Sequence, residues 1–352
     1  MATLLEYLNR AAKDGASDIF MVPGASVSYK LEGNLMPMDD ERLMPDRSRM
    51  LLEEIYGLAR RDMEAYRKTG DDDFSFAVPG LARFRVNAYK QRGSMAAVIR
   101  VVAFSIPDWQ TLGVPPQVME LADAHNGMVL VTGTAGCGKS TTMACLVDRI
   151  NKSRACHIIT LEDPIEYLHR NCKSIVSQRE IAVDTSDYLS ALRACLRQAP
   201  DVIQLGEMRD LETIRTAITA AETGHLLLAT LHTKGAVNTI DRIIDTFPAD
   251  QQDQIRIQLS AVLKTVVSQQ LVPDVNGEQI PMFEVMHMTS AIKTMIRDSK
   301  NHQIPGAIAS GSGEGMISMD QSLLAAYQAG RITRQTALEY ADNPEQMQRR
   351  ME

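Results

Sequence analysis

The sequence predicts an α/β protein in two parts: a doubly wound α/β core preceded by a smaller α+β domain. In the second part, short apolar strands alternate with helical segments, which favours a parallel sheet. The first part combines few helices with strands of antiparallel character. Between them, prolines and a glycine interrupt any regular pattern and indicate a linker. The predicted divisions are residues 1–104, a linker at 105–117, and 118–352.

The first domain opens with an amphipathic helix that Gly15 is placed to end. Strands are expected at residues 19–22 and 27–31, a second helix at 47–68, and further strands at 81–89 and 96–102. The apolar face predicted for the first helix comprises Leu4, Leu5, Leu8, Ala11 and Ala12.

The stretch 81–89 alternates with period two, which is typical of a strand with one buried face. Arg83 and Arg85 then share the polar face, where they could clamp phosphate charge. The alternative is an ordinary solvated strand face. The predicted buried face comprises Ala82, Phe84, Val86 and Ala88, and the polar face adds Asn87 and Tyr89.

The most informative motif matches G-x-x-x-x-G-K-[S/T], the phosphate-binding loop of nucleotide triphosphatases. An apolar run at 128–131 precedes it and a helix-compatible run at 141–147 follows, so strand, loop and helix are in the required order. Its glycines let backbone N–H groups point at phosphate oxygens. Lys139 would reach the β- and γ-phosphates of ATP, and the Ser140 hydroxyl would hold Mg²⁺. The motif reads Gly133-Thr134-Ala135-Gly136-Cys137-Gly138-Lys139-Ser140-Thr141.

Cys137 lies inside this loop, two residues before Lys139 and at the start of a predicted helix. These neighbours favour thiolate over thiol, so one hypothesis is a reactive, oxidation-sensitive thiol lining the phosphate site. The alternative is an inert small residue that faces the protein core.

Three polar clusters follow or flank apolar runs in the second domain. Glu162, Asp163 and Glu166 come after one run, Glu207 after the next, and His225 and His232 bracket a third. Ligands of open parallel sheets bind outside the carboxyl ends of the strands, where acids can order Mg²⁺ and an attacking water. Taken singly, each acid could instead be a helix cap, and each histidine a structural residue.

Gly/Ser-rich residues 310–315 predict a flexible loop before a last helical region at 321–341. The 20 methionines are scattered and are interpreted as flexible core filler.

Composition narrows the class of protein. With 45% hydrophobic and 23% charged residues, it is typical of an ordinary soluble globular protein, and its formal net charge of −7 gives no support to a global nucleic-acid-binding surface. Five cysteines without a C-x-x-C pair argue against a disulfide framework or zinc knuckle and suit a reducing cytoplasm. No signal peptide is evident and no apolar run approaches 18 residues, so membrane association would come through partners. The cysteines are Cys137, Cys145, Cys156, Cys172 and Cys195.

Together the motifs resemble the secretion-type ATPases, and within them the type IV pilus retraction ATPases (PilT/PilU-like). In that family, residues 133–141 match Walker A, 161–166 the Asp box, 206–210 Walker B and 223–233 the His box. In the first domain, 72–76 and 82–88 match as well. The resemblance covers nearly the whole chain, from Gly15 to Met316.

The resemblance implies a PAS-like N-terminal domain and a RecA-like ATPase domain, assembled as a homo-hexamer that binds ATP and Mg²⁺. It implies that Glu166 activates water and that Glu207 acts through Mg²⁺, with Glu162 in the catalytic set. His225 and His232 would sense the γ-phosphate and the neighbouring domain. Arginines of the first domain would complete the site: Arg83, Arg85, Arg92 and Arg100.

Three positions depart from the family pattern. Residues 291–298 read Ala-Ile-Lys-Thr-Met-Ile-Arg-Asp, where retraction ATPases usually carry Ala-Ile-Arg-Asn-Leu-Ile-Arg-Glu, and Lys293 keeps the charge without the bidentate fork. Gln204 interrupts an apolar strand, and a buried amide there needs partners, such as groups of the nucleotide site. Phe20 stands where PilT-like chains often have histidine, which agrees better with PilU-like chains.

We therefore expect a cytoplasmic Mg²⁺-dependent ATPase, peripheral at the inner face of the cytoplasmic membrane, whose ring drives pilus retraction through an inner-membrane platform protein. A paralogous retraction ATPase is a further expected partner. The alternatives are an accessory ATP-binding ring coupled to a second motor and an assembly ATPase. Assembly ATPases usually have a longer N-terminal region and a four-cysteine zinc module, which this sequence lacks. A nucleic-acid translocase is disfavoured by the acidic charge balance.

Overall fold

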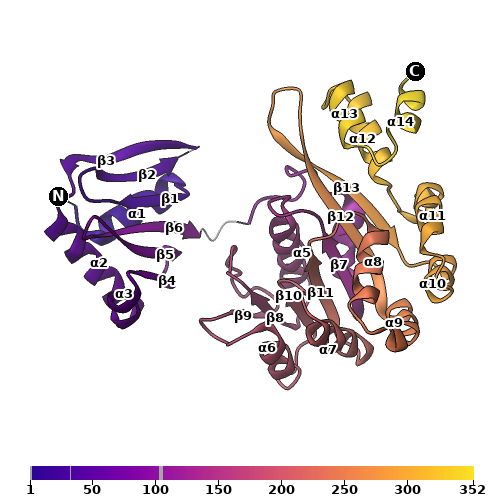
Figure 1. The fold of residues 1–352 in the computed structure, drawn as a ribbon, viewed down its shortest axis with the longest axis horizontal. Coiled ribbons are helices and arrows are strands. Elements are labelled where there is room, and N and C mark those ends of the chain that lie inside the picture. Colours follow the sequence, from indigo (N-terminus) through magenta and orange to yellow (C-terminus); the bar gives the residue numbers. More distant parts are fainter. Residues whose placement is uncertain (1, 32, 103–105) are drawn as a thin grey trace. The chain divides into compact units, whose positions relative to one another are not determined.

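The computed structural model describes residues 2–31, 33–102 and 106–352. The chain divides into two compact units, one formed by residues 1–105 with 166–168 and the other by 106–165 with 169–352. Each unit has its own sheet, as Figure 1 shows, and its own core of buried side chains. The fold is mixed α/β, as the sequence predicts.

The first unit is a six-stranded antiparallel sheet, in the order β3-β2-β1-β6-β5-β4, with three helices packed on it. Its phenylalanines and aliphatic side chains form one continuous core with those helices. The elements are α1 (Leu4–Asp14), β1 (Asp18–Met21), β2 (Ser26–Leu31), β3 (Asn34–Arg42), α2 (Pro45–Ala59), α3 (Glu64–Thr69), β4 (Asp71–Val78), β5 (Ala82–Gln91) and β6 (Ser94–Val102).

Helix α1 begins at a capping box of Thr3 and Glu6 and ends at Gly15, whose φ of 75° is the left-handed conformation that glycine tolerates best. Its predicted buried face is partly wrong. Leu5 is exposed and Ala12 only partly buried, whereas Tyr7 takes a core position. The spacing of Leu4, Tyr7, Leu8 and Ala11 is i, i+3, i+4, i+7, and the tyrosine completes it.

Two further predictions for this unit are corrected. The single helix expected at 47–68 is two helices, because Arg60 adopts φ 51° and ends α2. The strand β3 was not predicted, since its exposed, charged sequence lacks a buried face. In β5, by contrast, Ala82, Phe84, Val86 and Ala88 are all buried, which confirms the predicted alternation.

The second unit is a seven-stranded sheet in the order β13-β12-β7-β11-β10-β8-β9. All neighbours pair in parallel except β12 with β13, and helices cover both faces (Figure 1). Its strands are β7 (Gly127–Thr132), β8 (His157–Glu162), β9 (Ile175–Glu180), β10 (Val202–Leu205), β11 (Leu226–Leu231), β12 (Leu263–Pro273) and β13 (Gln279–His287).

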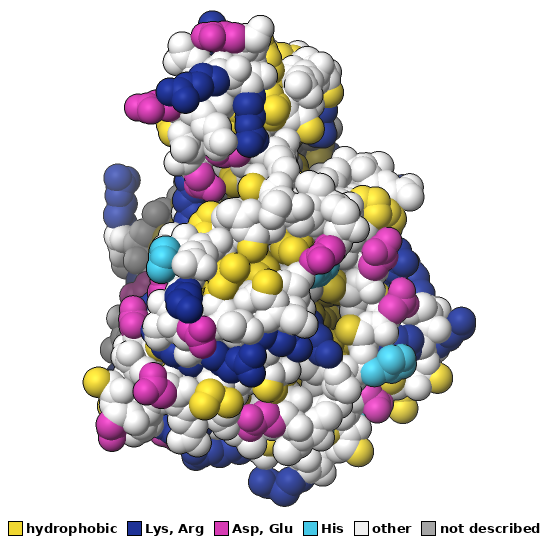
Figure 2. Space-filling model, turned by 90° about the vertical axis from the view of Figure 1, so that its right-hand side faces the viewer, with side chains coloured by type: hydrophobic (Ala, Val, Ile, Leu, Met, Phe, Trp, Pro, Cys, Tyr) yellow, Lys and Arg dark blue, Asp and Glu magenta, His cyan; other side chains and the backbone are white. Residues whose placement is uncertain are grey.

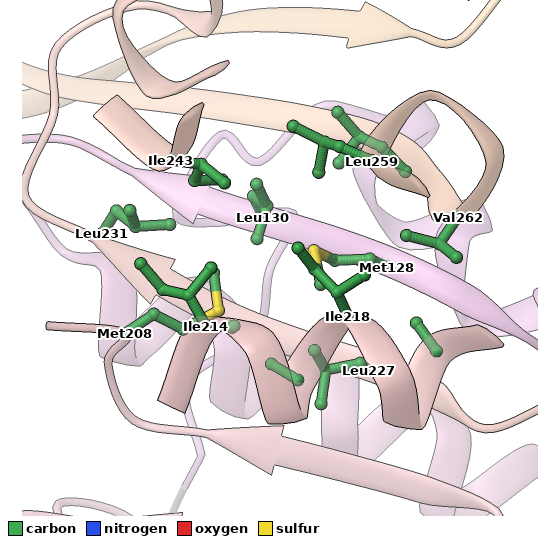
Figure 3. Close-up of a cluster of buried hydrophobic side chains, with 14 of the residues drawn as sticks. Met128, Leu130, Met208, Ile214, Ile218, Leu227, Leu231, Ile243, Leu259 and Val262 are labelled. Atoms are coloured by element: carbon green, nitrogen blue, oxygen red, sulfur yellow. The ribbon is translucent and has the colours of Figure 1, made fainter. Parts of the chain in front are cut away.

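The central strands of this sheet are buried on both faces. Figure 3 shows the core on one face, where Met128 and Leu130 of β7 meet Ile214 and Ile218 of one helix and Leu259 of another. The opposite face packs against the helix that follows the phosphate-binding loop.

The helices of the second unit are α4 (Pro116–Met119), η1 (Glu120–Asp123), α5 (Lys139–Ser153), α6 (Tyr188–Cys195), α7 (Leu211–Glu222), α8 (Ala236–Asp245) and α9 (Ala249–Val262), then α10 (Ser290–Arg297), η2 (Asn301–Gln303), α11 (Ile304–Ser310), η3 (Gly311–Glu314), α12 (Met319–Gln328), α13 (Arg334–Tyr340) and α14 (Pro344–Met351).

Two segments differ in detail from the predictions. Residues 311–314, within the predicted flexible loop, form a 3₁₀ turn. The chain packs closely there, since a Cβ on Gly311 would lie 2.5 Å from the methyl carbon of Met316. Of the segment predicted as a linker, residues 106–117 pack with the second unit, with Trp109, Leu112 and Val114 against its core; residue 105 lies outside the described residues.

The face drawn in Figure 2 mixes basic, acidic and hydrophobic side chains, with a short band of lysines and arginines among them. Among the described residues, no helix has both the length and the apolarity to cross a membrane.

Candidate nucleotide-binding site

The loop 133–138 joins the carboxyl end of β7 to the first residue of α5. Gly133, Gly136 and Gly138 have φ values of 141°, 76° and 91°, which other residues rarely adopt. A Cβ on Gly133 would also lie 2.1 Å from the carbonyl oxygen of Gln269 in β12. The loop therefore requires glycine for its conformation and for its close approach to the neighbouring strand.

Lys139 is buried in this loop, where its Nζ donates hydrogen bonds to the carbonyl oxygens of Gly133 and Thr134, each at 2.8 Å. These contacts hold the ammonium group inside the curl of the loop. Ser140 follows on the first turn of α5 and is exposed, so its hydroxyl is accessible. The N-terminus of α5 adds a dipole that favours an anion.

Gln269 supports the loop from β12 and was not singled out from the sequence. Its Oε1 accepts a hydrogen bond from the hydroxyl of Thr142 at 2.8 Å, and its Nε2 would lie 2.8 Å from a Cβ on Gly138. The sequence does not single out Gln269, because β12 also contains other polar residues, among them Ser268 and Gln270, and its partner Thr142 is 127 residues away.

The predicted reactive thiol is wrong for this conformation. Cys137 is only 2% exposed, and burial raises the pKa of its thiol, although the charge of Lys139 opposes that shift. Its sulfur would lie 2.6 Å from a Cβ on Gly133, so it packs inside the loop. Burial of the sulfur therefore outweighs the helix N-terminus and the charge of Lys139.

Glu162 and Glu207 lie at and just beyond the carboxyl ends of the adjacent strands β8 and β10. Glu162 accepts hydrogen bonds from the Thr160 hydroxyl at 2.6 Å and from the Gln178 amide at 3.0 Å. Glu207 is buried and pairs with Arg209, and its Oε2 lies 3.3 Å from Nε2 of His232. The structure thus brings Glu207 and His232 into contact.

The loop that carries Glu207 is tied to β11 by two hydrogen bonds. The Thr230 hydroxyl donates to the carbonyl of Gly206, and the amide of Met208 donates to the carbonyl of Thr230 at 3.1 Å. Tyr188 closes the other side, since its hydroxyl would lie 2.5 Å from a Cβ on Gly206. Burial and the nearby charge of Glu207 raise the pKa of Tyr188. Sequence reasoning missed Tyr188, which precedes Gly206 by 18 residues and has no motif.

His225 does not join this group. It precedes β11, at the amino end of the strand, whereas the phosphate-binding loop follows the carboxyl end of β7. Its Nδ1 lies 3.0 Å from the Ala220 carbonyl oxygen. At about 3.3 Å per residue, the six residues of β11 separate the two ends by roughly 20 Å. His225 therefore lies away from the phosphate-binding loop of its own chain, and its predicted role as a sensor of the γ-phosphate or of the neighbouring domain stays a prediction.

Glu166 is exposed in the segment after β8, beyond the cis Asp163–Pro164 peptide. Its predicted role toward water stays a prediction.

In the first unit, Arg85 of β5 lies directly opposite Arg100 of β6, on the polar face of the sheet. Asp18 of β1 pairs with Arg100 at 3.1 Å and reduces the repulsion between the two guanidinium groups. A shallow hollow is lined by Asp18, Asp73, Arg85, Asn87, Val98 and Arg100.

The four predicted arginines are not all neighbours. Arg83 lies two residues before Arg85 on the same face, whereas Arg92 is at the far tip of the β5–β6 hairpin, with a φ of 49°. Within this unit, the structure groups Arg83, Arg85 and Arg100 and separates them from Arg92.

The residues present fit a Mg²⁺ ion bound together with a nucleotide. Magnesium prefers hard oxygen ligands, and with nucleotides it takes one or two from protein and others from phosphate and water. The exposed Ser140 hydroxyl and the Glu207 carboxylate supply such oxygens, and Oε2 of Glu207 accepts no regular hydrogen bond from the described residues. Among those residues, no cluster of three or more acidic, histidine or cysteine ligands could hold a metal alone.

A groove of about 460 Å³ lies beside the loop, on the side of β12 and α13. Gln270 of β12 donates to the carbonyl of Tyr340 at 3.2 Å, and Lys234 lies 3.5 Å from Asp342. The C-terminal helices therefore flank the phosphate-binding loop. The groove is lined by Thr134, Ala135, Gly136, Cys137, Lys234, Gln269, Gln270, Leu271, Glu339 and Tyr340.

Comparison with known proteins shows the family of this chain. Residues 2–319 match the family described as Type II/IV secretion system protein. The chain is 41% identical to the type IV pilus retraction ATPase PilT of Pseudomonas aeruginosa over 97% of its length and 99% of that protein. It is 38% identical to the type IV pilus ATPase PilU of the same organism, over 96% of this chain and 88% of PilU.

Among solved structures, the pilus retraction motor PilT with bound ADP superposes with a TM-score of 0.90 at 42% identity, covering 99% of this chain and all of that one. The fold is accordingly that of a secretion ATPase, with an N-terminal domain followed by an ATPase domain. The chain belongs to the Type II/IV secretion system protein family and is a close homologue of the PilT pilus retraction ATPases.

Proposed function

We propose that this protein is a Mg²⁺-dependent ATPase that assembles as a homo-hexameric ring and drives retraction of a type IV pilus. One observation carries the proposal: the phosphate-binding loop, Glu207 and His232 occupy adjoining strand ends of a chain homologous throughout to PilT. The ring would act in the cytoplasm on an inner-membrane platform protein, with a paralogous ATPase as a further partner.

The residues would divide the work as follows. Backbone N–H groups of the loop and Lys139 bind the phosphates, and for this Lys139 exchanges its two carbonyl partners for phosphate oxygens. Ser140 and Glu207 would hold Mg²⁺, which would supply positive charge to the phosphate oxygens. Glu162 or Glu166 accepts the proton of the attacking water, and His232 reports the state of Glu207 through their contact. Arg83, Arg85 and Arg100 supply positive charge for the phosphates of a completed site.

Substitution of Lys139 and Glu207 tests this division. Lys139→Ala should weaken nucleotide binding at least tenfold, whereas Glu207→Gln should keep binding and lose turnover, because it removes charge with little change in shape. Glu212→Gln is the matched control, since Glu212 is an exposed acid of α7 that pairs with Arg193. ATP hydrolysis with and without Mg²⁺ and binding of a fluorescent ATP analogue are the measurements. A Glu207→Gln variant with the wild-type rate would contradict the assignment.

Deletion of the gene tests the cellular role. Loss of twitching with retained, abundant pili indicates retraction, and loss of the pili themselves indicates assembly instead. If the protein drives retraction, complementation with the Glu207→Gln variant should not restore twitching.

A second candidate is an accessory ring that binds ATP and couples to another motor. The altered helix α10 favours it: Ile292 and Ile296 are buried, which leaves Lys293 and Arg297 on the outer side of the helix. Changing Lys293–Asp298 to the usual retraction sequence would raise pilus retraction without a second motor if this reading is correct. Steady-state ATP turnover, measured on the purified protein alone, separates the retraction motor from the accessory ring.

A further inference from the structure

Gln204 lies in β10, three residues before Glu207, and is only 7% exposed. Its Oε1 atom is buried and accepts no hydrogen bond from any described residue. An unsatisfied buried acceptor destabilises the folded state. A leucine would fill the same strand position without this cost, so the glutamine needs another explanation.

The side chain of Gln204 points toward the face of the sheet that α5 covers. Val202, two residues earlier, packs in the cluster that contains Val147 and Ile150 of α5. Ile203 and Leu205 pack in the cluster on the other face. Because side chains alternate along a strand, Gln204 shares the face of the helix that follows the phosphate-binding loop.

Gln204 also extends a polar row across three strands. It is opposite Thr160 of β8, and Thr160 is opposite Gln178 of β9. Thr160 and Gln178 both donate to Oε1 of Glu162. Residues opposite each other in parallel strands point to the same face, so Gln204 continues this row toward β11. Thr160 and Gln178 have partners, and the oxygen of Gln204 has none among the described residues.

We propose that Gln204 is a positioning residue for ATP hydrolysis: its Oε1 accepts a hydrogen bond from the attacking water in the nucleotide-bound enzyme. The strand of Gln204 leads to Glu207 and the adjacent strand ends in Glu162, so the water lies between two carboxylates. A neutral amide fixes the orientation of a water without taking its proton, the role that glutamine has in GTPases of the phosphate-loop class. The proposal rests on the ATPase activity proposed above and does not depend on which carboxylate accepts the proton.

The proposal predicts opposite effects on stability and turnover. Gln204→Leu removes an unpartnered amide, so its melting temperature should equal or exceed that of the wild type. Its kcat should fall at least tenfold, while KM and the affinity for a non-hydrolysable ATP analogue change less than twofold. A merely structural glutamine would give the same gain in stability with an unchanged kcat.

Two further variants sharpen the test. Gln204→Glu keeps an acceptor at the same position and should retain more of kcat than Gln204→Leu. Thr132→Val is the matched control, because the Thr132 hydroxyl is also buried without a partner among the described residues but points to the opposite face with Met128 and Leu130. This control should keep the wild-type kcat.

The outcomes are distinct. A hydrolysing wild type with equal kcat in Gln204→Leu overturns this inference and leaves the proposed function intact. Equal losses in Gln204→Leu and Gln204→Glu overturn it as well, since the acceptor would then be irrelevant. A hexameric wild type without any Mg²⁺-dependent hydrolysis overturns both proposals. A selective loss of kcat in Gln204→Leu, with tight analogue binding, supports the positioning role.

Discussion

At the scale of single residues, close approach between side chain and backbone decides which positions tolerate change. Gly206 does not have a positive φ, yet Tyr188 and the Leu161 carbonyl leave no room for a Cβ. The carbonyl of the same residue is the acceptor for Thr230, so Gly206 links three elements around Glu207.

Gly206→Ala should therefore destabilise the protein by roughly 1–3 kcal/mol through overpacking against the Tyr188 hydroxyl. The double variant Gly206→Ala/Tyr188→Phe should recover part of that loss, because it removes the clashing oxygen. Urea unfolding of both single variants and the double variant gives the coupling free energy. Additive losses would show that the tyrosine is not the obstacle.

His169 predicts a pH dependence of stability. Burial lowers its pKa from the ordinary 6.5 to about 4. Between those values the unfolded chain binds a proton that the folded chain does not, so this histidine makes stability fall as pH falls from 6.5 toward 4. His169→Gln should flatten the melting temperature over that range, and exposed His302→Gln should leave the slope unchanged. An equally steep slope in His169→Gln would exclude this origin.

The sequence predicted the phosphate-binding loop well because its chemistry is local: glycines, lysine and serine stand at fixed spacing on a strand–loop–helix unit. It could not predict the approach of Gln269 or Tyr188, which depends on strand order. The motif also does not show that His225 and His232 lie far apart, since a histidine before a strand and one after it lie at opposite ends of that strand. For Cys137, the motif gave the neighbours, and only packing gave the burial.

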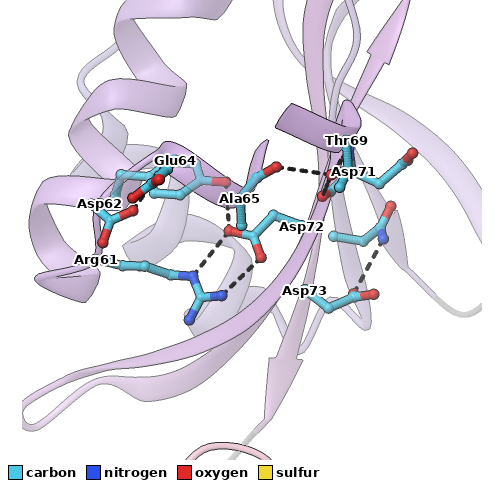
Figure 4. A network of polar contacts seen from close by, with 10 residues as sticks. Arg61, Asp62, Glu64, Ala65, Thr69, Asp71, Asp72 and Asp73 are labelled. Atoms are coloured by element: carbon cyan, nitrogen blue, oxygen red, sulfur yellow. Dashed lines mark hydrogen bonds and ion pairs between the residues drawn. The ribbon is translucent and has the colours of Figure 1, made fainter. Parts of the chain in front are cut away.

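At the scale of elements, the break between α2 and α3 is accompanied by a polar contact that no periodicity reveals. Figure 4 shows Arg61, just beyond α2, forming two hydrogen bonds of 2.9 Å with the carboxylate of Asp72 in β4. The Tyr56 hydroxyl donates to the same carboxylate at 2.9 Å. Tyr56 in α2 and Arg61 just beyond it therefore both connect this part of the chain to β4.

Arg61→Leu should destabilise the first unit by roughly 1–3 kcal/mol, because it leaves a buried carboxylate with fewer donors while the arginine itself is partly exposed. Adding Asp72→Asn should restore part of the loss, since the uncompensated charge disappears. Circular dichroism during urea unfolding measures both. A double variant less stable than Arg61→Leu would mean that the carboxylate has other essential donors.

At the scale of the whole molecule, the proposed function predicts a homo-hexamer in which arginines of the first unit contribute to ATP hydrolysis. We expect light scattering with a non-hydrolysable ATP analogue to give six times the 38.9-kDa chain mass. Arg85→Ala and Arg100→Ala should lower kcat. Arg92 lies apart from them at the hairpin tip, so Arg92→Ala should change kcat to a different extent. A fully active monomer would contradict the ring.

The strand β11 has a mechanical consequence. All six of its residues are buried, and it is bonded on both sides to parallel strands, so stretching it would break hydrogen bonds that no water can replace. The strand therefore resists stretching and links His232, which contacts Glu207, to His225 at its other end, roughly 20 Å away.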